Sequence, residues 1–164
     1  MENENVKRAF EGTRGVLLFF LRFVIASIVL YLIYTKLGVY YTKLVAYGAK
    51  PLLAIFKYRL VMERALKVTE DISLNPVVFL SLVIATGNVT LVTKLRAALW
   101  GFVILTAGNV VTIFLLFLYG YTRSETLGTG IDWLNLTTNF FLPLLLWFIL
   151  LPIRSLLPFR SSST

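Results

Sequence analysis

Long runs of apolar residues, separated by short polar stretches, dominate the chain. Four such runs cover residues 15–34, 76–92, 97–121 and 133–153. About twenty residues at a rise of ~1.5 Å match the roughly 30 Å hydrocarbon core of a bilayer. We therefore expect an all-α integral membrane protein whose four transmembrane helices form a single membrane domain over residues 1–164.

The first apolar run could instead belong to a cleavable signal peptide. A signal peptide has a shorter apolar region, followed by small residues at the cleavage site. Residues 34–37, Tyr-Thr-Lys-Leu, offer no such site. We therefore expect an uncleaved first helix.

Local helix signals accompany the second and fourth runs. The second opens on Asn75 and Pro76, and the fourth contains Pro143. Asn is a favoured N-cap residue, and Pro at the first helical position loses no hydrogen bond. A proline inside a helix frees a backbone carbonyl, which a neighbour must then satisfy. The pattern predicts a helix that starts at Asn75-Pro76 and a kink at Pro143.

The connection over residues 35–74 has a different pattern. Residues 43–57 are amphipathic and interrupted at Lys50-Pro51, which is typical of a segment in the membrane interface. From residue 56 onward, apolar side chains occupy even positions and charged ones mostly odd positions, a period near two. This alternation favours a strand or hairpin over a helix, although a helix stays open as the alternative. We predict a short extracytoplasmic β-like segment over residues 56–70.

Composition supports the membrane assignment and narrows the chemistry. The chain is 58% hydrophobic and 15% charged, against roughly 45–50% and 25% in soluble domains. It contains no cysteine and no histidine, which removes disulfides, thiolate nucleophiles, imidazole bases and most transition-metal sites. No nucleophile and base pair or phosphate-binding loop is recognisable. We expect no enzymatic activity, no cofactor and no metal.

Basic residues set the expected orientation. Short cytoplasmic loops of membrane proteins are enriched in Lys and Arg. With the N-terminus inside, the short outer loop after the third run carries only Arg123, whereas the inner segments carry seven basic residues: Lys7, Arg8, Arg14, Lys94, Arg96, Arg154 and Arg160. The first loop holds seven more, but long structured loops obey the rule poorly. We expect a multi-pass protein of the cell inner membrane with both termini cytoplasmic, and residues 155–164 as a disordered tail.

The net charge of +8 then fits membrane lipid rather than nucleic acid, because anionic headgroups attract basic residues near a bilayer. Arg22 is the one charged residue inside the first run. A charge in hydrocarbon costs about 2.5–3.5 kcal/mol on insertion scales and is a functional hypothesis by default. Its long stem can also snorkel to the interface. Either a headgroup or a buried partner on another helix could satisfy it.

Three asparagines, Asn88, Asn109 and Asn139, lie inside apolar runs. Such amides usually hold helices together by hydrogen bonds worth roughly 0.6–2 kcal/mol each. The alternative is that the three amides line a polar path for a solute in a small transporter or channel subunit. No acidic residue or histidine lies inside a run, which disfavours proton coupling.

The order of features resembles the small exosortase-associated membrane proteins of bacteria. The residues that carry the resemblance are 58–62 (Tyr-Arg-Leu-Val-Met) through 74–79 (Leu-Asn-Pro-Val-Val-Phe), the turn around Arg96, and 141–147 (Phe-Leu-Pro-Leu-Leu-Leu-Trp). The resemblance implies an accessory role beside an exosortase, a membrane enzyme that processes anchored proteins. Exosortases depend on a Cys, Arg and His set, and this chain has neither Cys nor His.

The expected function is therefore a non-catalytic accessory subunit of a bacterial inner-membrane complex, assisting an exosortase-type protein-sorting enzyme. Its expected partners are a membrane protein and membrane lipid. The alternative is the transporter or channel subunit with a path along the three asparagines. Candidate binding residues for the partner or a lipid headgroup are Arg22, Arg59, Arg64, Asn75 and Pro76. A third hypothesis, an enzyme that binds lipid phosphate through arginines, is the least favoured, because such an enzyme would lack a base.

Overall fold

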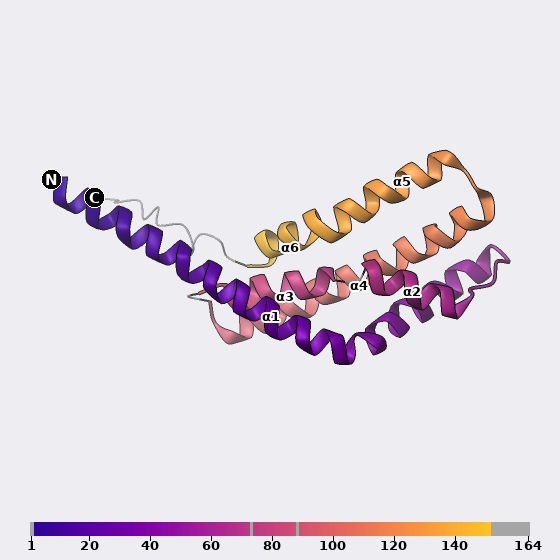
Figure 1. Ribbon diagram of the computed structural model, residues 1–164, viewed down its shortest axis with the longest axis horizontal. Coiled ribbons are helices and arrows are strands. Elements are labelled where there is room, and N and C mark those ends of the chain that lie inside the picture. Colours follow the sequence, from indigo (N-terminus) through magenta and orange to yellow (C-terminus); the bar gives the residue numbers. More distant parts are fainter. Residues whose placement is uncertain (1, 73, 88, 152–164) are drawn as a thin grey trace.

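The computed structural model describes residues 2–72, 74–87 and 89–151, all of which form helices or the turns between them (Figure 1). No strand occurs within these ranges. The elements are α1 (Glu2–Ile55), α2 (Met62–Ile72), α3 (Asn75–Ala85), α4 (Leu91–Thr122), α5 (Glu125–Leu136), the π-helix η1 (Thr137–Phe141) and α6 (Leu142–Leu150). The predicted all-α class is confirmed, and the predicted tail over residues 155–164 lies outside the described ranges.

Three helical segments are long and apolar enough to cross a membrane: Arg14–Ile55, Leu91–Thr122 and Glu125–Leu150. They agree with three of the four predicted spans and indicate a membrane protein. The span predicted over residues 76–92 is wrong as a single helix. α3 has eleven residues, which cover only about 16 Å at ~1.5 Å per residue. It ends because Thr86 adopts an extended conformation, with φ −62° and ψ 116°.

α1 is much longer than the predicted first span. Its 54 residues correspond to about 80 Å of helix, and the ribbon bends part-way along (Figure 1). The helix continues through the expected break at Pro51 to Ile55, and Lys57 then turns the chain with a φ of 60°. Only the start of α1 extends beyond the other helices (Figure 1). Residues 14–37, which we call the arm, run past α3 and the end of α6, and the later part of α1 packs beside α4 and α2.

The strand predicted over residues 56–70 is wrong, because Met62–Ile72 is helical. Among its described side chains, Ala65 and Thr69 are buried and Met62 and Leu66 half-buried, whereas Glu63, Arg64 and Lys67 are exposed. Spacings of three and four place the inward-facing group on one helical face. The apparent period of two arose because the alternation was counted across the turn at residues 56–61, which is not part of the helix.

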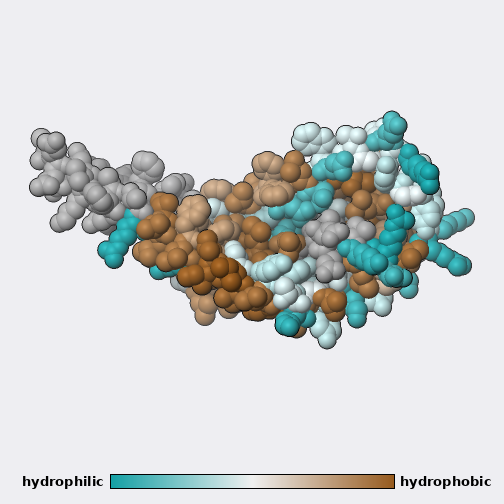
Figure 2. Space-filling view, in the orientation of Figure 1, coloured by the Kyte–Doolittle hydropathy of each residue, from teal (hydrophilic) through white to brown (hydrophobic). Residues whose placement is uncertain are grey.

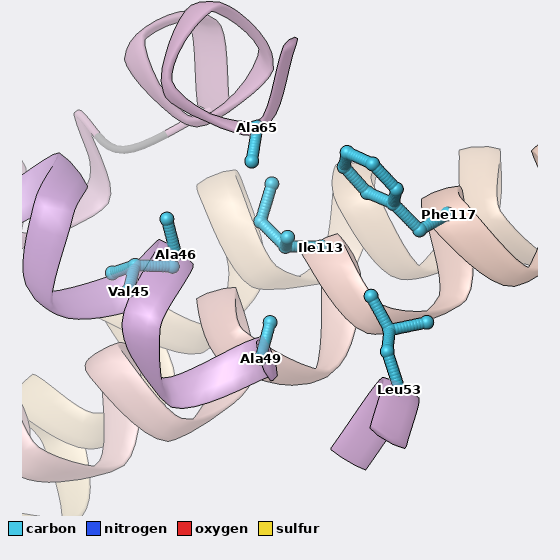
Figure 3. Packing of buried hydrophobic residues seen from close by; sticks show 7 residues of the cluster. All are labelled: Val45, Ala46, Ala49, Leu53, Ala65, Ile113 and Phe117. Atoms are coloured by element: carbon cyan, nitrogen blue, oxygen red, sulfur yellow. The ribbon is translucent and has the colours of Figure 1, made fainter. Parts of the chain in front are cut away.

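Two apolar clusters hold the helices together. The first lies between α1, α2 and α4, where small α1 residues allow close approach (Figure 3); it contains Val45, Ala46, Ala49, Leu53, Ala65, Ile113 and Phe117. The second lies between α3, α4 and α6 and contains Phe79, Val83, Ala97, Leu105, Leu146 and Leu151. α4 contributes to both clusters and is the central helix of the bundle.

The two clusters mark opposite ends of the molecule. At the end that carries the α1 arm, the rings of Phe19 and Trp147 lie 5.6 Å apart. At the other end, Tyr58 stacks on Tyr121 with ring centroids 4.3 Å apart. Figure 2 shows hydrophobic surface along the arm and more hydrophilic surface towards the end with α2 and the α4–α5 turn. The start of α1 and the end of α6 therefore share one end of the bundle.

Candidate functional site

A buried pair of amide side chains joins α3 to α4 between the two apolar clusters. Asn75 Nδ2 donates to Asn109 Oδ1 at 2.9 Å, and Asn109 Nδ2 donates back to Asn75 Oδ1, also at 2.9 Å. Both side chains are 1% exposed. Two reciprocal bonds between planar amides satisfy both carbonyl oxygens and one N–H of each amide.

The second N–H of Asn75 donates to the backbone of η1. Asn75 Nδ2 donates to the backbone carbonyl of Thr138, 3.2 Å away, in η1. Within η1, the Leu142 N–H bonds the carbonyl of Thr137, five residues back. The next carbonyl in this register, that of Thr138, would need the N–H of Pro143, which proline lacks. Asn75 thus satisfies the carbonyl that Pro143 leaves free.

The second N–H of Asn109 reaches α1. Asn109 Nδ2 donates to the Tyr41 hydroxyl oxygen at 2.9 Å, and Thr106 Oγ1 lies 3.5 Å from the same oxygen. The two amides therefore connect α1, α3, α4 and η1 in one polar layer. Buried polar groups with every donor and acceptor engaged specify one arrangement of helices. We name Tyr41, Asn75, Asn109 and the Thr138 carbonyl the amide layer.

The expected role of Asn75 as a helix N-cap is wrong. The cap position is Leu74, no side chain caps the helix, and a proline stands in its first turn as predicted for Pro76. Asn75 and Pro76 are both buried. The Asn75 amide turns inward because the amide layer gives it three hydrogen bonds, whereas an N-cap would give it one.

Arg22 lies near the turn between α3 and α4. It is exposed, and its Nη1 would be 3.2 Å from a Cβ atom built on Gly87. Lys94, at the start of α4, donates from Nζ to the Ile84 carbonyl at 3.2 Å, a favourable place for a cation because carbonyls at a helix C-terminus carry partial negative charge. Two basic side chains thus gather at the end of α3.

Arg59 and Arg64 lie at the other end of the bundle. Both are exposed, and the Arg59 carbonyl accepts a 2.6 Å hydrogen bond from the hydroxyl of Tyr121, near the end of α4. Arg22 is at the opposite end of α4, beside the turn that precedes Leu91. The three candidate arginines and the buried Asn75-Pro76 pair therefore do not form one site.

Two of the three asparagines proposed to line a polar path have different hydrogen-bond partners in the structure. Asn109 belongs to the amide layer, whereas the Asn139 amide donates to Asn135 one helical turn earlier. Asn139 Oδ1 is buried without a hydrogen-bond partner in the part of the chain that is described. Asn88 lies outside the described residues. A path through Asn109 would require its hydrogen bonds to open.

A metal site would need a group of ligating side chains within the described ranges. No cluster of three or more His, Cys, Asp or Glu side chains there could hold a metal ion. Two features escaped the sequence analysis: the hydroxyl of Tyr41 as a partner of Asn109, and the indole Nε1 of Trp147, which donates to Thr86 Oγ1 at 2.8 Å. Neither partner could be found from spacing, because both contacts join residues more than sixty positions apart.

The comparisons with known proteins identify no relative. No protein-family model, no curated protein and no solved structure matches the chain.

Proposed function

We propose that this protein is a non-catalytic accessory subunit of a membrane complex, and that the arm of α1 binds its partner. The observation that carries the proposal is the exposure of that arm. Among residues 14–37, only Ala26 is buried. Leu17 is 68% exposed, Phe20 59% and Ile28 56%. α4, by comparison, buries seven of its residues.

Lipid alone would solvate an apolar helix, so the stronger indication of a protein partner is Arg22 in the arm. No acidic residue lies between Glu11 and Glu63, so α1 cannot neutralise Arg22 from within its own apolar segment. Intramembrane arginines usually pair with other charged groups or with carbonyls. A partner helix packed on the arm would supply a carboxylate or a free carbonyl to the exposed guanidinium of Arg22.

The interior of the bundle supports a structural role. The four N–H groups and two oxygens of the Asn75 and Asn109 side chains all bond within the chain. Groups that bind a transported solute or a substrate must be free to exchange partners. The amide layer is instead suited to fixing helix positions, so that the arm is presented in a defined direction.

The resemblance of residues 58–79 and 141–147 to exosortase-associated proteins motivates the identity of the partner. We infer an exosortase-type protein-sorting enzyme of the bacterial inner membrane, with the termini of this chain on the cytoplasmic side. Arg59 and Arg64, exposed at the far end of the bundle, would then face the outer surface and contact the partner or a lipid headgroup.

The experiment uses the absence of native cysteine. Single-cysteine variants L17C, V24C and I28C on the arm are labelled in membranes with a photoactivatable maleimide and irradiated. L99C on α4 and I149C on α6, which are 64% and 68% exposed in the wild type, are the matched controls. We expect one heavier crosslinked species from arm positions only, containing a second membrane protein identified by mass spectrometry.

The arginine gives a second readout. R22Q is expected to reduce the crosslinked fraction from L17C at least several-fold while leaving the amount of protein in the membrane unchanged. Crosslinks that form equally from the arm and from the controls, or only to lipid, would contradict the proposed subunit role.

A further inference from the structure

Exposed lysines repeat along the later part of α1. Lys43 and Lys50 are exposed on the helix, and Lys57 is exposed in the turn that follows it. The three residues are spaced seven apart, a spacing that keeps side chains on one face of a helix. Because no acidic residue lies between Glu11 and Glu63, α1 cannot neutralise these lysines from within its own apolar segment.

α5 carries two acidic residues with the same spacing. Glu125 and Asp132 are seven residues apart and both are exposed, as are Thr129 and Leu136 on the same strip of the helix. They are the only acidic residues in the three segments that can cross a membrane. Neither forms an ion pair with a basic residue in the part of the chain that the structure describes. Their charge is therefore available to an external cation.

Lys50 lies beside the apolar interior of α4 and not beside its ends. A Cβ atom on Gly48 would be 2.8 Å from the side chain of Val110, and the rings of Phe56 and Phe114 are 5.5 Å apart. Since Lys50 lies between these two contacts, its level on α4 falls near residues 110–114. An ionised side chain at such a depth usually pairs with an opposite charge.

Asp132 lies at a similar level on α4. A Cβ atom on Gly128 would be 3.0 Å from the ring of Tyr119, and one on Gly108 would be 3.2 Å from the methyl group of Thr138. Asp132 lies between Gly128 and Thr138, so its level falls between residues 108 and 119 of α4. These contacts also show that α5 runs antiparallel to α4, whereas α1 runs parallel to it.

The acid and the lysine are kept apart within one chain, because α4 lies between α1 and α5 (Figure 1). We propose that α5 of a second copy packs against the later part of α1, with Asp132 of that copy paired with Lys50. The equal spacing and antiparallel direction of the two helices then bring Glu125 of that copy to Lys57. Lys43, one heptad earlier, faces no acidic residue in this register.

The two faces also determine the type of assembly. A two-fold interface uses the same patch on both copies, which the positions of α1 and α5 on different sides of α4 do not allow. Each copy instead binds one neighbour through α1 and another through α5, and such contacts close into a ring of three or more copies. The ring uses α1 beyond the arm, so it does not depend on the partner proposed for the arm.

Cysteine crosslinking of the full chain in phosphatidylcholine vesicles tests the contact. Y47C and L136C lie one turn from Lys50 and Asp132 and are 58% and 42% exposed in the wild type. A mixture of the two single variants, treated with a short bifunctional maleimide, should give a dimer, whereas either variant alone should not. The Y47C/L136C double variant should give trimers and larger species. L99C on α4, which is 64% exposed in the wild type, should give no dimer when mixed with L136C.

Charge variants show whether the ion pair holds the copies together. K50Q and D132N should each reduce the crosslink between Y47C and L136C at least several-fold, and the K50D/D132K exchange should restore it at unchanged helix content by circular dichroism. K43Q removes the same charge where no acid faces it and should crosslink normally. No dimer from the mixture, as much dimer with L99C, an undiminished crosslink in K50Q and D132N, an equal loss in K43Q, or an exchange variant that keeps its helix content without restoring the crosslink would overturn the proposal.

Discussion

Replacement of Gly101 by alanine is expected to lower the free energy of unfolding by about 1–3 kcal/mol, the usual cost of an overpacked core. A Cβ atom at Gly101 would lie 2.1 Å from the ring of Phe79, far inside contact distance. Phe79 is fully buried, so its ring can move only by displacing the cluster between α3, α4 and α6. Denaturation by SDS in mixed micelles, followed by circular dichroism, measures the change.

Gly120 provides the matched control in the same helix. A Cβ atom there meets nothing within 4 Å, so G120A is expected to stabilise α4 by up to about 1 kcal/mol through helix propensity. In an F79A background, G101A should cost much less, because the clashing ring is gone. Equal effects of G101A and G120A, or an undiminished cost beside F79A, would contradict the close approach of α3 to α4.

The second large effect is expected in the amide layer. N109A should destabilise the protein by about 1–3 kcal/mol, since it leaves the buried Asn75 amide and the Tyr41 hydroxyl without their shared partner. N75A should destabilise the protein by a similar amount, and it should also leave the carbonyl of Thr138 without its hydrogen-bond donor. SDS denaturation of both single variants and the double variant gives the coupling energy.

The double variant decides whether the two amides act together. Because the reciprocal bonds are lost with either residue, N75A/N109A should cost clearly less than the sum of the single variants. N135A, which removes the hydrogen bond that Asn135 accepts from Asn139 one helical turn along, is the control and should add independently to N109A. Additivity of N75A and N109A would show that the amide pair does not form.

The sequence predicted the parts of this fold that depend on local hydrophobicity. The apolar runs at residues 97–121 and 133–153 correspond to α4 and to the continuous segment α5–η1–α6, because a run of about twenty apolar residues satisfies a span on its own. Near Pro143, where the sequence predicted a kink, the structure has the π-helical turn η1. The missing backbone N–H of proline, on which that prediction was based, is a local property as well.

Features that depend on distant contacts could not be predicted. Asn75 looked like an N-cap because its neighbours in sequence are those of a helix start, whereas its amide partner is 34 residues away. α2 was mistaken for a strand because seven alternating positions crossed a turn.

The central claim is that the bundle crosses the membrane, with the two ends of α4 on opposite sides. The most direct measurement is labelling of single-cysteine variants by a membrane-impermeant maleimide in intact and permeabilised cells. T126C tests the α4–α5 end, L91C the start of α4, and R14C the arm of α1. We predict that T126C labels in intact cells, whereas L91C and R14C label only after permeabilisation. Labelling of T126C and L91C from the same side, or of R14C together with T126C, would contradict the account.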